Sequence, residues 1–246
     1  MFCAAEALLR WQHPSRGLLS PAVFIPASED SGIILKLGEW ALREACREAS
    51  NWKVPYRVAV NIPPIQCQQG DLPSLVLEIL LEADIEPHRL ELEVTESVLI
   101  SDYDRARSIL RRLESLGVRI ALDDFGTGYS SLAYLQSFPF DKIKIDRTFV
   151  GNVTRSPQSA AIVRAVIGLA RALRMPVTAE GIETKEQLDF LTNEGCDELQ
   201  GYLLGRPKPA QDFSLLAADI TAAASTSDSG RRGDGSAKAN LCNLVA

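Results

Sequence analysis

Short apolar runs alternate with longer amphipathic stretches along most of this chain, and this alternation restricts the possible folds. We expect strands at residues 4–9, 57–62, 90–95, 118–122, 142–145, 177–179 and 198–199. Helices are expected at 37–51, 72–83, 103–116, 130–136, 160–173 and 184–193, with a short one opening at Pro21. Parallel strands need such long connections, so the pattern predicts an α/β protein with a mostly parallel sheet covered by helices. This sheet is either open and doubly wound or closed into a barrel.

Polar side chains stand at the carboxyl end of each expected strand. In chain order they are Glu6, Asn61, Glu93 with Glu96, Asp123 with Asp124, Lys144, Glu180 with Glu183, and Gln200. In a (β/α) barrel every strand contributes to an active site at this end, whereas an open sheet places its ligand at one switch point. The even spread therefore favours a barrel. Only seven strands are visible, so the first strand and helix of an eight-stranded barrel are expected to be missing.

So many converging carboxylates would repel one another and raise one another's pKa unless cations neutralised them. Carboxylate and amide oxygens suit Mg²⁺ or Mn²⁺, and the two histidines, His13 and His88, do not lie at strand ends. The adjacent Asp123 and Asp124 are placed to serve two ions, one of them bridging both. A two-metal site of this kind predicts hydrolysis of a phosphodiester bond by an activated water.

Charge and composition exclude several other classes of protein. The net charge of −6 argues against non-specific binding of nucleic acid, which needs an excess of basic side chains. The five cysteines are scattered and form no CxxC pair, which suggests a reducing cytoplasm rather than a disulfide framework or a zinc finger. Apolar stretches are broken well before 18 residues, so no membrane span is predicted. We expect one folded domain over residues 1–216 and a small, polar, disordered tail over 217–246.

Eight motifs follow one another in order from Glu6 to about Phe213. They are EALLRWQHP (6–14), FIPASEDSG (24–32), VNI ending near Asn61, LELEVTES (90–97), LDDFGTGYSSL (122–132), KIKID (142–146), AEGIET (179–184) and QGYLLGRP (200–207). Together they resemble an EAL domain. The resemblance implies a modified (β/α)8, TIM-like barrel that binds cyclic di-GMP and two Mg²⁺ or Mn²⁺ ions. It also implies hydrolysis of one phosphodiester bond to give linear pGpG.

The resemblance further implies a role for each matching residue. Glu6, Asn61, Glu93 and Asp123 resemble the ligands of one metal, and Asp123, Asp124 and Glu180 those of the second. Lys144 and Glu180 resemble residues that position the attacking water. Arg10, Asp146 and Gln200 are expected to contact substrate. Glu96 and Glu183 resemble supporting residues, with Glu96 anchoring the loop 124–131, which contains Gly126 and Gly128 and links the site to a homodimer interface. Family members can also carry sensory or diguanylate cyclase modules upstream.

Simpler interpretations of the same residues remain open. Glu93 could be the polar half of an alternating strand, Asp123 and Asp124 a turn cap, and the acids at 180 and 183 a helix start. Lys142 shares a strand face with Lys144, so the motif alone does not say which lysine points inward. The missing first strand and Pro63, which removes a backbone donor after Asn61, depart from the family pattern. The alternative function is an inactive EAL-type receptor for cyclic di-GMP, or a protein-interaction module.

Overall fold

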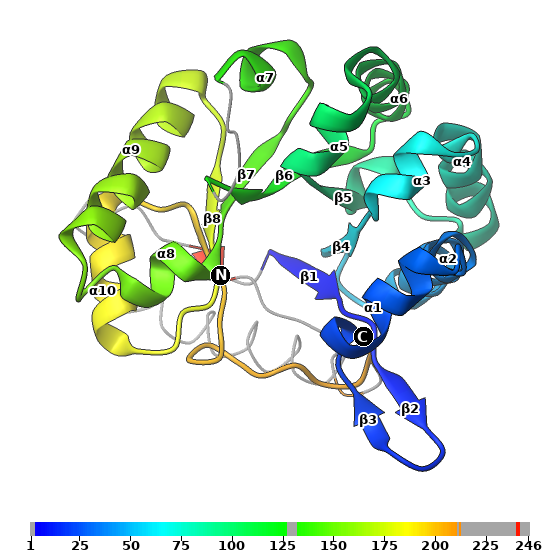
Figure 1. The fold of residues 1–246 in the computed structure, drawn as a ribbon, viewed down its shortest axis with the longest axis horizontal. Helices are drawn as coiled ribbons and strands as arrows, with labels where there is room; N and C mark the ends of the chain where they lie inside the picture. Colours follow the sequence, from blue (N-terminus) through cyan, green and yellow to red (C-terminus); the bar gives the residue numbers. More distant parts are fainter. Residues whose placement is uncertain (1–2, 127–131, 211, 213–239, 242–246) are drawn as a thin grey trace.

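The computed structural model describes residues 3–126, 132–210, 212 and 240–241 of the chain. Its centre is a curled parallel sheet with helices on the outer face (Figure 1). The strands of this sheet, in spatial order, are β1 (Ala4–Ala7), β4 (Arg57–Asn61), β5 (Leu90–Thr95), β6 (Arg119–Phe125), β7 (Lys142–Ile145), β8 (Val177–Ala179), β9 (Glu198–Leu199) and β10 (Asn240–Leu241). The predicted α/β class and barrel-like parallel sheet are thereby confirmed.

Helices form most of the connections between these strands. They are α1 (Pro21–Asp30), α2 (Ile34–Ser50), α3 (Pro64–Gln68), α4 (Leu72–Ala83), the 3₁₀ turn η1 (Pro87–Arg89), α5 (Glu96–Ser101), α6 (Tyr103–Ser115), α7 (Leu132–Ser137), α8 (Arg147–Asn152), α9 (Pro157–Leu173) and α10 (Lys185–Glu194). The longer ones are amphipathic, as α6 illustrates with Ala106, Ile109, Leu110 and Leu113 buried on one face. None of the helices in the described ranges combines the length and apolarity that a membrane crossing requires.

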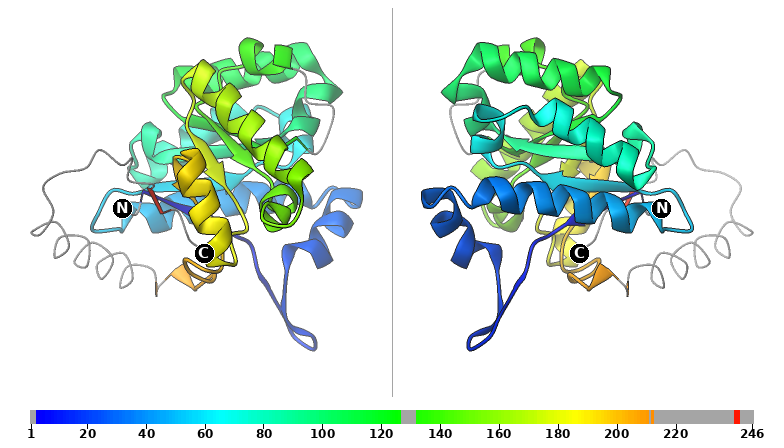
Figure 2. Two further views of the ribbon diagram at one scale, coloured as in Figure 1. Left: turned by 90° about the vertical axis from the view of Figure 1, so that its left-hand side faces the viewer. Right: turned by 90° about the vertical axis from the view of Figure 1, so that its right-hand side faces the viewer.

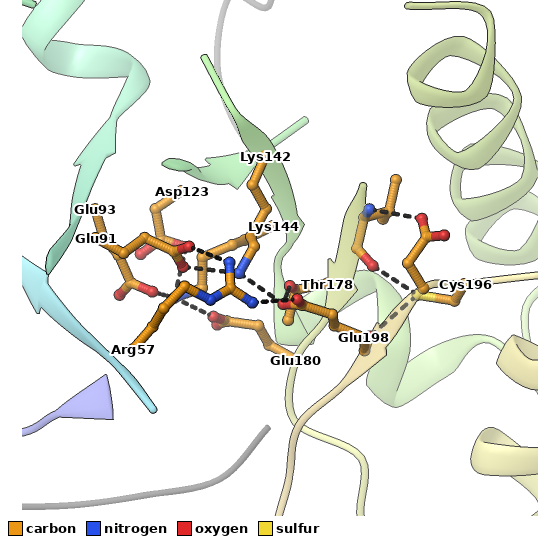
Figure 3. Close-up of polar contacts among 12 residues, drawn as sticks. Arg57, Glu91, Glu93, Asp123, Lys142, Lys144, Thr178, Glu180, Cys196 and Glu198 are labelled. Carbon is orange, nitrogen blue, oxygen red and sulfur yellow. Dashed lines mark hydrogen bonds and ion pairs between the residues drawn. The ribbon is translucent and has the colours of Figure 1, made fainter. Parts of the chain in front are cut away.

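The strands are buried on both faces, but the two faces differ in chemistry. In β5, Leu90 and Leu92 are fully buried among the surrounding apolar side chains, while Glu91 and Glu93 alternate with them and point into the barrel. In β7, Ile143 and Ile145 alternate with Lys142 and Lys144 in the same way. The apolar core therefore lies between sheet and helices, and the barrel interior holds buried charges (Figure 3).

Along the chain, a hairpin and the two helices α1 and α2 lie between β1 and β4. The antiparallel strands β2 (Trp11–His13) and β3 (Gly17–Leu19) project away from the sheet and lead into α1 (Figure 2). Trp11 packs edge-on against Phe24 of α1 at a centroid distance of 5.9 Å. The helix opening at Pro21 agrees with the prediction, whereas the hairpin was not predicted, because its strands are only three residues long.

The two edges of the sheet lie at β1 and β10. Each strand from β1 to β9 pairs with its spatial neighbour in parallel, but in the described residues no backbone ladder joins β1 to β9 or β10. We call this gap in the ladder the seam. Residues 240–241 form β10 and pair with the edge of β9. The remainder of the predicted tail from 217 lies outside the described residues.

Candidate active site

The carboxyl ends of the strands bring predicted site residues from distant parts of the chain to one mouth. Lys144, on β7, is almost fully buried. Its Nζ lies 2.6 Å from Oε1 of Glu93 on β5, 2.5 Å from Oε1 of Glu180 just after β8, and 3.6 Å from Oδ1 of Asp123 on β6 (Figure 3). One ammonium group therefore stands among three carboxylates from three different strands.

Glu6, at the mouth end of β1, is held by two amide side chains. Its Oε1 accepts a 2.8 Å hydrogen bond from Nδ2 of Asn61, and its Oε2 accepts a 2.6 Å bond from Nε2 of Gln200. Asn61 ends the neighbouring strand β4, while Gln200 follows β9 on the other side of the seam. This pair of bonds fixes the Glu6 carboxylate and connects the two sides of the seam at the mouth.

Asp123 and Asp124 owe their arrangement to an irregularity in β6. The pairing register between β6 and β7 shifts between Leu122 and Phe125, and Asp124 adopts a positive φ of 54°. The backbone N–H of Asp124 donates a 2.9 Å hydrogen bond to Oδ1 of Asp123. Aspartate tolerates this left-handed conformation better than most residues, which explains why a strand can end in this way here. Asp123 is buried and Asp124 half-buried.

The crowded charges shift the pKa of several groups. Burial, reinforced by the Glu6 carboxylate, raises the pKa of Glu93 well above its usual value, although Lys144 opposes the shift. Burial also raises the pKa of Glu180 to about 8 against the opposing effect of Lys144. Burial and the neighbouring Asp123 raise the pKa of Asp124 to about 6. Protons therefore compete with cations for this site near neutral pH.

Lys144 and Glu6 shift toward their charged forms. Burial lowers the pKa of Lys144, but the surrounding carboxylates outweigh it and hold the pKa well above the usual lysine value. Burial raises the pKa of Glu6, yet Lys144 and the hydrogen bonds from Gln200 and Asn61 bring it below the usual glutamate value. The mouth therefore carries a permanent cation, Lys144, and a permanent anion, Glu6.

Glu96 supports the start of the predicted loop. Its Oε1 accepts a 3.0 Å hydrogen bond from the backbone N–H of Gly126, which has a φ of 97°. A Cβ atom on Gly126 would come within 3.2 Å of the Phe149 ring. Both this contact and the positive φ favour glycine at the position. Gly128, the other predicted loop glycine, lies outside the described residues.

The remaining predicted residues occupy the surroundings of the carboxylates. Asp146 caps helix α8 by accepting a 2.9 Å hydrogen bond from the N–H of Thr148, and its charge adds to the raised pKa of Asp124. Glu183 lines a cavity of about 160 Å³ with Glu180 and Gln200. Arg10 instead lines a larger apolar groove of about 800 Å³ beside the hairpin, where its NH1 donates to the carbonyl of Leu9. The structure therefore groups Glu183 with the mouth and Arg10 with the adjacent groove.

The backbone after β8 and the backbone after β9 pass close to each other at the mouth, and Gly201 makes this close approach possible. The N–H of Ile182 donates to the carbonyl of Gln200 at 3.0 Å. A Cβ atom on Gly201 would lie 2.1 Å from the Ile182 nitrogen and 2.2 Å from its oxygen. Only glycine fits so close to backbone. This close approach sets Glu180 and Gln200 side by side at the ends of β8 and β9.

The chemistry of this donor set fits hard divalent cations. Five carboxylates, Glu6, Glu93, Asp123, Asp124 and Glu180, share the mouth with the single amine of Lys144. Among the described residues, Oε2 of Glu93 is buried without a hydrogen-bond partner, which leaves it available as a ligand. No three acidic, histidine or cysteine side chains in the described part form a ready metal-ligand set. Lys144 stands between the carboxylates that would have to converge.

A second group of charges beneath the mouth, most of them buried, was not predicted from the sequence. We call it the floor ring, and it consists of Arg57, Glu91, Lys142 and Glu198 (Figure 3). Alternation already contained the signal, because Glu91 and Lys142 precede Glu93 and Lys144 by two residues and so share their strand faces. Both lysines of KIKID therefore point inward, at different depths.

Comparison with known proteins places this site in a family. The EAL domain model matches residues 2–207, which is most of the chain. The chain belongs to the EAL domain family. The match spans the strands from β1 to β9 and all of the predicted site residues, so the whole mouth described above lies within the EAL domain.

Relatives within the EAL family include named phosphodiesterases. The chain is 46% identical to the bifunctional diguanylate cyclase/cyclic di-GMP phosphodiesterase MucR of Pseudomonas aeruginosa, over 85% of this chain and 31% of that protein. It is 41% identical to the cyclic di-GMP phosphodiesterase PdeR of Escherichia coli, over 85% and 32%. It is 57% identical to an uncharacterized signaling protein of Caulobacter vibrioides, over 87% and 26%. The chain thus spans about a quarter to a third of the length of these curated relatives.

A solved EAL structure matches the fold closely. The phosphodiesterase domain of Pseudomonas aeruginosa MucR, in complex with c-di-GMP, superposes with a TM-score of 0.82 at 46% sequence identity. The match covers 85% of this chain and 86% of that one. The curled sheet described here is therefore the barrel-like sheet of EAL domains.

Proposed function

We propose that this chain hydrolyses cyclic di-GMP to linear pGpG with the help of two divalent cations, Mg²⁺ or Mn²⁺. The observation that carries the proposal is the buried Lys144 surrounded by Glu93, Asp123 and Glu180 at one strand-end mouth. EAL relatives named as cyclic di-GMP phosphodiesterases support the choice of substrate. In the reaction one water adds across one P–O bond, so the cyclic dinucleotide opens to a linear one.

We propose the cation ligands that the family resemblance implies. Glu6, Asn61, Glu93 and Asp123 would hold one cation, and Asp123 would share the second with Asp124 and Glu180. Bound cations would neutralise the carboxylates, make a water more acidic and stabilise the charge that develops on the leaving oxygen. The arrangement of Glu6 is already fixed by the bonds from Asn61 and Gln200.

The chain's own side chains would then position and protonate the reacting groups. Lys144 keeps its charge, so it supplies a fixed hydrogen-bond donor directed at the attacking water. Glu180, with a pKa of about 8, holds or releases a proton near neutral pH, which suits a residue that orients water. Arg10 and Asp146 are proposed to contact the substrate from the groove and from the start of α8.

The direct test is to incubate the purified chain with cyclic di-GMP and Mn²⁺ or Mg²⁺ and to separate the products by ion-pair chromatography. We expect pGpG to appear only with a divalent cation, and Glu93→Gln to abolish it while the exposed control Lys185→Met retains it. Nucleotide binding without any pGpG under both cations would overturn the proposal and identify the chain as a receptor.

We also propose that the chain forms a homodimer through the loop 124–131 and its surroundings, as the family resemblance suggests. Residues 127–131 of this loop lie outside the described residues, so the proposal rests on Glu96 and Gly126 at its start. Light scattering coupled to size exclusion measures the mass directly. A monomer of 26.9 kDa at micromolar concentration, with and without nucleotide, would overturn it.

A further inference from the structure

The floor ring is a closed circuit of four ions, of which Glu91, Lys142 and Glu198 are buried and Arg57 is half-buried. Lys142 Nζ lies 2.8 Å from Oε1 of Glu91 and 2.6 Å from Oε2 of Glu198. Arg57 contacts the other oxygen of each acid, at 3.1 Å and 2.8 Å. Oγ1 of Thr178 donates a further 2.9 Å hydrogen bond to Glu198. Every carboxylate oxygen of the ring therefore has a cationic partner, and the two positive and two negative charges cancel.

The neutral ring differs from the mouth above it, which has an excess of carboxylates. Burial raises the pKa of Glu198, but Lys142 and Arg57 outweigh it and hold the pKa at about 2. Burial likewise lowers the pKa of Lys142, and Glu91 and Glu198 outweigh it. Glu198 and Lys142 therefore stay charged at physiological pH without a bound metal ion. The ring therefore has no free carboxylate to offer a metal ion.

The position of Arg57 in the sheet suggests a function for the ring. Arg57 begins β4 and Glu198 begins β9, so their 2.8 Å contact spans the seam, where no backbone ladder joins the described strands (Figure 3). At the mouth, Gln200 and Glu6 span the same seam. Gln200 lies two residues after Glu198, and alternation places both on the inner face of the barrel. One contact at each depth therefore holds β9 against β1 and β4.

We propose that Arg57 is a positioning residue: by binding Glu198 across the seam, it keeps β9 where Gln200 can hold the Glu6 carboxylate for a cation. This inference rests on the proposed function, because Glu6 is taken there as a cation ligand. Lys142 bonds the same Glu198 carboxylate, but from β7, on the side of β9 that is already joined through β8. Lys142 cannot replace Arg57 in spanning the seam.

Two charge-balanced double variants separate positioning from simple charge balance. Arg57→Met with Glu91→Gln removes the contact across the seam and leaves Lys142 paired with Glu198. Lys142→Met with Glu91→Gln keeps the contact between Arg57 and Glu198. Each double variant loses one positive and one negative charge, so neither is left with an unpaired ion. Arg43→Met serves as a surface control, because Arg43 also binds three glutamates, but on the outside of α2 and α4.

We expect the first double variant to bind Mn²⁺ about tenfold or more weakly by calorimetry, the range found when residues that orient metal ligands are removed. The second double variant and Arg43→Met should bind as the parent does, and Arg57→Lys with Glu91 retained should recover part of the affinity. Hydrogen exchange of the peptide covering residues 198–204 should accelerate only in the first double variant. All measurements are made well below the unfolding temperature of each protein.

Other results for the two double variants would contradict the role proposed for Arg57. Equal loss of Mn²⁺ affinity in both double variants would show that the ring only balances charge, and unchanged affinity in both would show that it does not reach the site. If the parent chain itself binds no Mn²⁺ and yields no pGpG, the proposed function fails. Hydrogen exchange then still tests Arg57, since equal exchange in the two double variants would exclude a role in holding β9.

Discussion

Nζ of Lys144 lies 2.5 Å from Oε1 of Glu180, although the two residues are 36 positions apart (144 and 180) and belong to neighbouring strand ends. Lys144 is 2% exposed as a side chain and Glu180 is 19% exposed. Water screens such a pair poorly, so each charge depends on the other. The same ammonium group also contacts Glu93, and the loss of this one cation would therefore leave at least two buried carboxylates uncompensated.

Lys144→Met should lower the free energy of unfolding by about 3 kcal/mol in EDTA at about pH 8.5, above the pKa of Glu180, because removing one partner of a buried ion pair leaves the other uncompensated. Adding Mn²⁺ should return part of this stability, since a cation can take over the balancing charge. Urea denaturation followed by circular dichroism measures both effects. Lys185→Met, at an exposed ion pair, is the control and should change little. Equal stability of Lys144→Met and the parent would contradict the central place of Lys144.

The free energy of unfolding in EDTA should fall as the pH rises from about 4.5 to about 8. In that window the unfolded chain has released the Glu180 proton, whereas the folded chain keeps it until its pKa of about 8 is passed. The folded state therefore binds more protons, and one proton corresponds to about 1.4 kcal/mol per pH unit. The raised pKa values of Glu93 and Asp124 act in the same direction. Glu180→Gln should flatten the slope, and an unchanged slope would argue against a retained proton.

Mn²⁺ binding at pH 7 should release protons to the buffer. At this pH Glu180 is mostly protonated and Asp124 mostly ionised, and a carboxylate must lose its proton to become a ligand. Calorimetry in two buffers of different ionisation enthalpy counts the released protons. We expect about one proton per protein at pH 7 and fewer at pH 9. Binding that is independent of the buffer at pH 7 would exclude Glu180 as a ligand.

Gly201→Ala should destabilise the fold by about 2–3 kcal/mol or more, because the new Cβ atom would overlap the backbone of Ile182. The strands carrying Glu180 and Gln200 would have to separate, so catalytic activity should fall as well. Gly151→Ala is the matched control. Gly151 lies in helix α8, and a methyl group added there would meet no atom within 4 Å, so this change should be neutral or slightly stabilising. Thermal unfolding distinguishes the two variants.

Glu96→Ala should reduce kcat roughly tenfold, because the N–H of Gly126 would lose its acceptor at the start of the loop. Glu96→Gln keeps an oxygen in the same place and should retain most of the activity. Steady-state kinetics with cyclic di-GMP gives kcat and KM for both variants. Equal kcat for Glu96→Ala and the parent would show that this hydrogen bond does not support the reaction.

Most of the sheet could be predicted from local sequence because each strand pairs a short apolar run with a polar end. Strands such as β5 and β7 begin and end where the pattern indicated. The short hairpin β2–β3 and the one- or two-turn helices α3, α5 and α8 could not be predicted, since three to six residues give too little periodicity. Strand β10 was missed because its pairing with β9 depends on a partner about 40 residues away.

For the site, sequence could indicate which residues stand at strand ends but not how they interact. Alternation placed Lys142 and Lys144 on one face, yet it could not assign one to the mouth and the other to the floor. The contact of Arg57 with Glu198 links residues 141 positions apart, and no local pattern signals such a pair. The positions of Asp146 and Arg10 depend likewise on how a helix and a hairpin leave the barrel.

The register shift in β6 allows two consecutive aspartates to serve one rim, whereas in an unbroken pleat they would diverge to opposite sides of the sheet. Removing either aspartate would restore the pleat between Leu122 and Phe125 and leave a single carboxylate at the rim. Length is therefore as strictly constrained as chemical identity in this short stretch. A deletion there should be far more damaging than an exchange of Asp for Asn.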